Sequence, residues 1–255
     1  MNLQLEDRTF VVTAASRGLG LSVAKVLVGE KANVIICGRS KKPLKDAASS
    51  LGSRCQYFVA DVATSADVTA LLNFTKEQTS KLDGLFVNAG GPPSGTFAEI
   101  SDDDWSKGFD LTLMSAIRLT REAIPLLKKS DAPSILYSTS ISVKQPIPNL
   151  LLSNSLRPAV IGMMRTLSEE IGPEGIRTNA VCPGYINTER VKQLMSATKP
   201  KSNAAEDAIV ARIPLGRMGT PDEFGRVCAF LLSPLASYVH GALLLIDGGL
   251  FKGMM

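Results

Sequence analysis

The feature that most constrains the fold is a short apolar strand that runs directly into a turn of small residues. The strand is predicted over Thr9–Thr13, and residues 14–20 read AASRGLG. A helix is predicted to begin at Gly18, because apolar residues recur at helical spacing from Leu19 to Leu27. The free N–H groups and positive dipole end of that helix make the turn a binding site for an anion. The alternative is a turn with a structural role only, and the motifs in the rest of the chain decide between these two interpretations.

If the anion is a pyrophosphate, the two glycines have separate uses. Gly18 and Gly20 let the phosphates approach the main chain and let the helix pack closely on the strand. The other residues of the turn then lie beside the cofactor. The predicted contacts from this stretch are Thr13, Ala15, Ser16, Arg17, Gly18, Leu19 and Gly20.

The chain of 255 residues is 45% apolar and 20% charged, which is typical of an ordinary globular core. Its net charge of +4 is spread along the sequence, so no nucleic-acid partner is expected. No apolar run reaches membrane-spanning length, and Glu6 and Asp7 interrupt any signal peptide, so no membrane partner is expected. The four cysteines are widely spaced without a CxxC pair, which favours a reducing compartment and a cytoplasmic protein, with no metal site.

Strand and helix patterns alternate along the whole chain without a linker or repeat. The strand segments are continuously apolar, as expected for a parallel sheet covered on both faces. We therefore predict one α/β domain over residues 1–255, a Rossmann-type doubly wound parallel sheet of about seven strands with helices on both faces. The predicted strands are Thr9–Thr13, Ala32–Cys37, Cys55–Ala60, Leu82–Asn88, Ser134–Ser138, Arg177–Cys182 and Leu243–Asp247.

The end of the second strand indicates which dinucleotide is bound. An acidic residue there would hydrogen-bond the ribose 2′-hydroxyl of NAD, but this chain offers Arg39 and Ser40, with Arg17 in the first turn. Guanidinium groups suit a 2′-phosphate, so NADP(H) is preferred over NAD(H). Solvated surface arginines are the alternative.

Polar and small residues end the next two strands. Asp61, followed by Val62, is placed either to accept a hydrogen bond from the adenine amino group or to cap a helix. Asn88, Ala89 and Gly90 form a small turn that leaves room for a cofactor, and the Asn88 amide can tie neighbouring strands.

These motifs, in this order, resemble the short-chain dehydrogenase/reductase family, in particular 3-oxoacyl-(acyl carrier protein) reductase-like and glucose dehydrogenase-like members. Ala14 stands where the family has its first glycine, which is tolerable if the turn keeps a negative φ there. The resemblance implies a cofactor contact at the nicotinamide side, a substrate lid at about residues 189–213, and a homotetramer with an interface role for the apolar segment 250–255. The implied nicotinamide-side residues are Pro183, Gly184, Ile186 and Thr188.

The resemblance fails at the catalytic residues. The family uses a Ser, a Tyr, a Lys four residues later and an upstream Asn. Aligned through residues 159–162, Ser153 stands at the Tyr position and Arg157 at the Lys position. Ser140 matches the family Ser, and Thr112 stands at the Asn position.

This replacement changes the available chemistry. A tyrosine titrates near 10, whereas a serine hydroxyl has no comparable pKa, so Ser153 is no like-for-like acid. Arg157 can bind ribose hydroxyls and a developing oxyanion but cannot relay a proton. A desolvated Lys144 could protonate an alkoxide, and a surface lysine is the alternative. Pro158 is expected to disturb the helix at a cost of about 3 kcal/mol.

Three interpretations follow. The first is an NADP(H)-dependent carbonyl reductase or alcohol dehydrogenase for a small or medium substrate, with oxyanion stabilisation by Ser140, Ser153 and Arg157 and a proton from water or Lys144. The second is an enzyme of the same fold with changed chemistry. The third is a non-catalytic NADP(H)-binding sensor or scaffold. Only turnover separates the first two from the third.

Overall fold

The computed structural model describes residues 2–196 and 203–254. Its seven strands form one parallel sheet in the order β3-β2-β1-β4-β5-β6-β7. The predicted fold class and all seven predicted strands are confirmed, with ends that differ by no more than two residues. The strands are β1 (Thr9–Val12), β2 (Asn33–Gly38), β3 (Cys55–Val59), β4 (Gly84–Val87), β5 (Ser134–Ser138), β6 (Arg177–Pro183) and β7 (Leu243–Ile246).

The strand order reverses between β1 and β4. Strands are added outward on one side as β2 and β3 and on the other as β5, β6 and β7. In open α/β sheets a crevice forms at such a reversal, outside the carboxyl ends of the strands. The predicted glycine turn follows β1 and the Asn88 turn follows β4, so both lie at this crevice.

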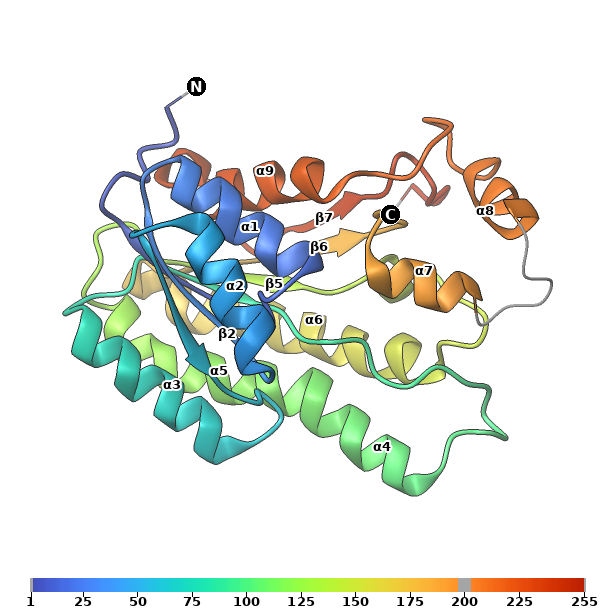
Figure 1. The fold of residues 1–255 in the computed structure, drawn as a ribbon, viewed down its shortest axis with the longest axis horizontal. Helices are drawn as coiled ribbons and strands as arrows, with labels where there is room; N and C mark the ends of the chain where they lie inside the picture. The colour runs from blue at the N-terminus through green and yellow to red at the C-terminus, as the bar shows by residue number, and fades with distance from the viewer. Residues whose placement is uncertain (1, 197–202, 255) are drawn as a thin grey trace.

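Two layers of helices cover the sheet (Figure 1). On one face α3 (Ser65–Gln78), α5 (Ser115–Leu127) and α6 (Leu151–Ile171) pack against Val11 and Leu85 of the central strands. On the other face lie α1 (Gly18–Gly29), α2 (Lys41–Leu51) and α9 (Pro221–Leu232), which enclose Phe10 and Val12. Phe10, Val11 and Val12 therefore enter different cores in alternation and are all buried, which explains the continuous apolar pattern.

The helices that do not cover the sheet lie toward its carboxyl edge. The helix α4 (Asp102–Phe109) passes through a π-helical turn, η1 (Asp110–Met114), into α5. The predicted lid contains α7 (Glu189–Ser196) and α8 (Asn203–Val210), drawn in orange in Figure 1. Residues 197–202 of the predicted lid lie outside the described residues. Three short 3₁₀ turns complete the chain: η2 (Ile141–Val143), η3 (Gly172–Glu174) and η4 (Pro234–Ala236).

Pro158 does not interrupt α6, so the prediction of a disturbed helix was wrong. The helix continues from Leu151 to Ile171, and Pro158 lies on its exposed side. Buried Leu156 and Val160 flank the proline and hold both halves of the helix on the core. Packing therefore offsets the local cost of the proline. Within the described residues, no helix has the length and apolar character needed to cross a membrane.

Candidate active site

The glycine turn, residues 14–20, is a tight backbone connection between β1 and α1. Gly18 has φ +61°, and a Cβ at Gly20 would lie 2.6 Å from the Ala14 carbonyl oxygen. Ala14 itself has φ +49°, so the expectation of a negative φ there was wrong. The Ala15 N–H donates to the Cys37 carbonyl at 2.9 Å, which fixes the turn against β2 and forces Ala14 into the left-handed region.

The helices α1 and α2 both begin without a capping side chain. Arg17 at the start of α1 and Ser40 at the start of α2 make no side-chain cap hydrogen bond, and neither first turn holds an acidic residue. By contrast, α4 and α9 begin with complete capping boxes, Ser101 with Asp104 and Thr220 with Glu223. The free N–H groups and positive dipole ends of α1 and α2 fit the phosphates of a dinucleotide.

Arg17 and Arg39 are both exposed, and neither forms an ion pair within residues 2–196 and 203–254. Ser40 is also exposed. The β2 end that carries Arg39 lies against the glycine turn, because a Cβ at Gly38 would be 3.7 Å from Ser16. The residues expected to bind a 2′-phosphate are thus exposed and lie in or beside the glycine turn.

Asn88 ties β4 to β1, as predicted. Its amide nitrogen donates to the carbonyl oxygens of Thr13 at 3.4 Å and Ala14 at 3.5 Å, and the Thr13 hydroxyl donates to the Asn88 carbonyl at 2.6 Å. Asp61 accepts from the Ala63 N–H at 3.0 Å and so closes the turn after β3, whereas Thr64 is the N-cap of α3. The adenine role of Asp61 and Val62 stays a prediction.

The turn after β6 comes back to the glycine turn. The Gly184 N–H donates to the Ile246 carbonyl at 3.0 Å, and Ile186 is buried beside Gly219. Thr188 follows, and its Cγ2 lies 3.8 Å from the position of a Cβ at Gly18. The structure therefore brings the 183–188 segment, predicted for the nicotinamide side, against the start of α1.

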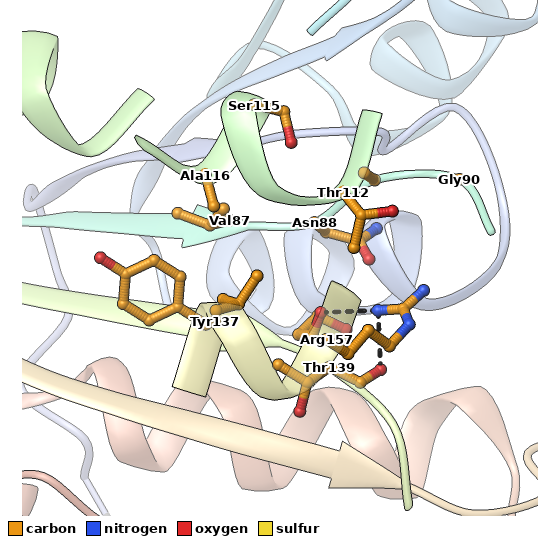
Figure 2. A pocket seen from close by; sticks show the side chains of 12 residues that line it. Val87, Asn88, Gly90, Thr112, Ser115, Ala116, Tyr137, Thr139 and Arg157 are labelled. Atoms are coloured by element: carbon orange, nitrogen blue, oxygen red, sulfur yellow. Dashed lines mark hydrogen bonds between the residues drawn. The ribbon is translucent and has the colours of Figure 1, made fainter. Parts of the chain in front are cut away.

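Ser153 and Arg157 form a hydrogen-bonded pair one turn apart on α6, which we call the α6 pair. The Arg157 Nε donates to the Ser153 hydroxyl at 3.0 Å. Its Nη1 donates to two main-chain carbonyls at the carboxyl end of β5, Ser138 at 3.3 Å and Thr139 at 3.0 Å (Figure 2). Burial and the neighbouring charge of Arg190 lower the pKa of Arg157 to about 10, so the guanidinium remains cationic at neutral pH.

Ser142 is a site residue that the sequence did not single out. Its buried hydroxyl lies 3.2 Å from that of Ser153. The hydroxyl of Ser140, in contrast, accepts from the Ser142 N–H at 3.1 Å and caps η2. Ser140 therefore shapes the turn that presents Ser142 to the α6 pair. Four serines and threonines crowd residues 138–142, and no spacing rule distinguishes among them.

Thr112 lies across the pocket from Arg157 (Figure 2). It belongs to the π-helical turn η1, a rare distortion often found at functional sites. Its hydroxyl is buried and has no hydrogen-bond partner among the described residues. It lines a cavity of about 20 Å³ shared with Asn88, Gly90 and Arg157. That volume accommodates one water molecule.

The lysine and tyrosines near the site are not organised as acids. Lys144 is exposed at the end of η2, so the desolvated lysine considered from sequence is not found. Tyr137 is buried within β5, where its hydroxyl bonds Thr120 at 2.8 Å and burial raises its pKa. Tyr185 packs with Ile141 and Ile213.

Arg190 is the second site residue that the sequence did not single out. It lies in the first turn of α7, and its Nη2 donates to the Pro92 carbonyl at 2.8 Å. Burial lowers its pKa. A cation two residues after Thr188 was visible in the sequence, but only the fold brings it to the loop after β4.

This arrangement is that of a dinucleotide-binding α/β protein, and comparisons identify its family. The family model described as Enoyl-(Acyl carrier protein) reductase matches residues 13–251. Oxidoreductase UcpA of Escherichia coli (strain K12) is 30% identical over 250 residues, covering 96% of this chain and 95% of the relative. The chain belongs to the short-chain dehydrogenase/reductase family of oxidoreductases.

Two solved structures share the whole fold. L-sorbose reductase from Gluconobacter frateurii, complexed with NADPH and L-sorbose, has a TM-score of 0.94 at 28% identity, with 100% of both chains covered. The NADPH-bound short chain oxidoreductase from Pseudomonas aeruginosa PAO1, described as containing an atypical catalytic center, has a TM-score of 0.89 at 30% identity. It covers 97% of this chain and 99% of its own.

Proposed function

We propose that this protein is an atypical NADP(H)-dependent reductase of a small or medium carbonyl compound, or the dehydrogenase of the corresponding alcohol. The observation that carries the proposal is the meeting of Gly18 and Thr188 at the reversal of strand order, with the α6 pair at the same edge of the sheet. The cofactor, when bound, supplies or accepts the hydride. NADPH-bound relatives of this fold support that assignment.

Arg39, Arg17 and Ser40 are proposed to select the 2′-phosphate of NADP(H). Among the described residues no carboxylate pairs with either arginine, and the uncapped start of α2 adds main-chain N–H groups. The start of α1 is proposed to hold the pyrophosphate, with Asp61 and Val62 at the adenine and Asn88–Gly90 and Pro183–Thr188 around the nicotinamide.

The α6 pair is proposed to stand where the family has its Tyr and Lys. Arg157 stabilises the negative charge that develops on the substrate oxygen, and Ser153 donates a hydrogen bond to that oxygen. Ser142 and Ser140 hold Ser153 in place through the β5–α6 turn. None of these groups releases a proton easily, so the proton comes from water in the cavity beside Thr112. Lys144 serves as a surface cation, given its exposure.

Binding of the two cofactors tests the proposal. NADPH and NADH are titrated by cofactor fluorescence against the wild type, Arg39→Ala and the control Lys45→Ala on the exposed side of α2. Loss of a charged hydrogen bond is worth about 1.5–3 kcal/mol, so Arg39→Ala is expected to weaken NADPH binding by about 10–100-fold and leave NADH unchanged. Absence of binding by either cofactor would overturn the proposal.

Oxidation of NADPH by a panel of ketones and aldehydes tests catalysis. Arg157→Met is expected to lower kcat by about 100-fold, as for removal of an oxyanion donor. Binding without turnover on any carbonyl would instead select a non-catalytic NADP(H)-binding protein. One observation favours that alternative. The Nε and Nη1 groups of Arg157 already donate hydrogen bonds to protein oxygens, so these groups are engaged in the structure rather than directed at a substrate.

We also propose a homotetramer in the cytoplasm. Apolar side chains that remain exposed on α9 and on the edge strand β7 support association: Phe230 is 36% and Leu244 40% exposed. The four cysteines are buried and unpaired, which suits a reducing compartment. Sedimentation that shows only monomer would contradict the assembly.

A further inference from the structure

Arg190 is fixed against the loop that follows β4. A Cβ at Gly91 would lie 2.8 Å from both its Nε and its Nη2, so the guanidinium rests directly on the backbone at this glycine. The 2.8 Å hydrogen bond from Nη2 to Pro92 adds a second point of attachment. Only one of the five N–H donors of this side chain is thereby used within the described part of the chain.

Neither Arg190 nor Arg157 has a carboxylate partner there. No Asp or Glu side chain of the described residues lies within 4.0 Å of either guanidinium. Glu189, the acid nearest to Arg190 in sequence, lies 3.6 Å from Lys192. Two half-buried cations close enough to interact, without a counterion, are costly unless a negative group completes the site.

The position of Arg190 separates it from the phosphates of a dinucleotide. Thr188 precedes α7, and Arg190 lies in the first turn of that helix. Thr188 faces Gly18 at the start of α1, whereas Arg190 faces Gly91 and Pro92 after β4. The orphaned hydroxyl of Thr112, in the cavity that Arg157 lines, adds an unsatisfied polar group at the same end of the site.

We propose that Arg190 is a specificity-determining residue for an anionic group of the substrate, a carboxylate or a phosphate. A guanidinium donates two parallel N–H hydrogen bonds to such a group. This inference rests on the proposed reductase function and names its substrate class: a carbonyl compound that carries a negative charge.

Turnover with matched substrate pairs tests the inference. The pairs are 3-oxobutanoate with its methyl ester and glyceraldehyde 3-phosphate with glyceraldehyde, assayed on wild type, Arg190→Gln, Arg190→Lys and the control Lys192→Gln. Arg190→Gln is expected to raise KM for the charged member of one pair by about 10–100-fold and to leave its neutral member and NADPH binding unchanged. Arg190→Lys recovers part of the loss. The affected pair distinguishes carboxylate from phosphate.

Anion binding without turnover is measured separately. Acetate and inorganic phosphate are added to the NADPH-loaded protein, and its melting temperature is recorded for the wild type and Arg190→Gln. A rise that the variant abolishes supports the anion site even if no carbonyl is reduced, in which case the reductase proposal alone fails. Equal KM values within both pairs, no anion-dependent rise in melting temperature, or an Arg190→Gln variant that only weakens NADPH binding would overturn the inference.

Discussion

The glycine turn and the α6 pair share one edge of the sheet but are built by different means. The glycine turn uses backbone: a Cβ at Gly20 would meet a carbonyl oxygen at 2.6 Å, and the helices that begin there offer main-chain N–H groups. The α6 pair uses side chains, with Arg157 held by two carbonyls and a hydroxyl. A backbone site tolerates few substitutions, whereas a side-chain site can exchange its chemistry on the same scaffold.

The largest effect is expected for a substitution that disrupts the glycine turn. In Gly20→Ala the new methyl group would lie 2.6 Å from the Ala14 oxygen and 2.9 Å from the Ala15 Cα, so α1 must move away from the turn. We expect unfolding to become easier by about 1–3 kcal/mol and NADPH binding to fall by more than tenfold. Thermal unfolding and cofactor fluorescence measure both effects.

Gly29→Ala is the matched control. Gly29 ends the same helix and has nothing within 4 Å of its Cβ position, so alanine should raise stability by about 0.5–1 kcal/mol and leave cofactor binding intact. Equal behaviour of the two variants would mean that close packing at the turn is not what shapes the site.

The second largest effect is expected for a substitution that removes one side chain of the α6 pair. Ser153→Ala removes the acceptor of Arg157 Nε and the partner of the Ser142 hydroxyl inside a buried cluster. Leaving such groups unsatisfied costs about 1–3 kcal/mol. We expect the melting temperature to fall by about 2–4 °C for each kcal/mol in a protein of this size, with cofactor affinity unchanged.

Ser155→Ala, on the exposed side of the same helix, should stay within about 0.5 kcal/mol of the wild type. If Ser153→Ala loosened NADPH binding as strongly as Gly20→Ala, the division into a backbone half and a side-chain half would be wrong.

The same division explains what the sequence predicts. The strands, the open start of α1 and the Asn88 tie follow from local patterns, and the structure contains all of them. Ser142 and Arg190 are different, since each becomes a site residue only through a contact with another element, α6 for Ser142 and the loop after β4 for Arg190. The errors at Ala14 and Pro158 have one cause: tertiary contacts outweigh a local preference worth a few kcal/mol.

A substitution at Ala14 is expected to have a smaller effect, and one that stabilises the protein. Its φ of +49° strains an L-residue by about 1–2 kcal/mol, and glycine would relieve this at some entropic cost. Ala14→Gly is therefore expected to raise the free energy of unfolding by about 0.5–1 kcal/mol. Denaturant titration measures the gain. Ala159→Gly, on the exposed side of α6, should lose about 1 kcal/mol, and a loss in both variants would refute the strain at Ala14.

The smallest effect concerns α9, the helix that packs on α1 and begins with its own capping box. The Arg217 side chain, and then the Thr220 N–H, hold the pKa of Glu223 at about 2, below its ordinary value of 4.5. A carboxylate with a lowered pKa stabilises the folded state fully above about pH 4.5, and this contribution is lost as the pH falls toward 2.

Glu223→Gln should therefore destabilise the protein at pH 6 and progressively less between pH 4.5 and pH 2. The urea midpoints of variant and wild type at both ends of that range measure the difference, with Glu170→Gln on the exposed side of α6 as control. Because Glu223 is exposed to solvent and ions, high salt should reduce the difference further. If the difference in urea midpoint between Glu223→Gln and the wild type grew at low pH, the charge of Glu223 would not be what stabilises the start of α9. The contrast between the capped start of α9 and the uncapped start of α1 would then carry no energetic meaning.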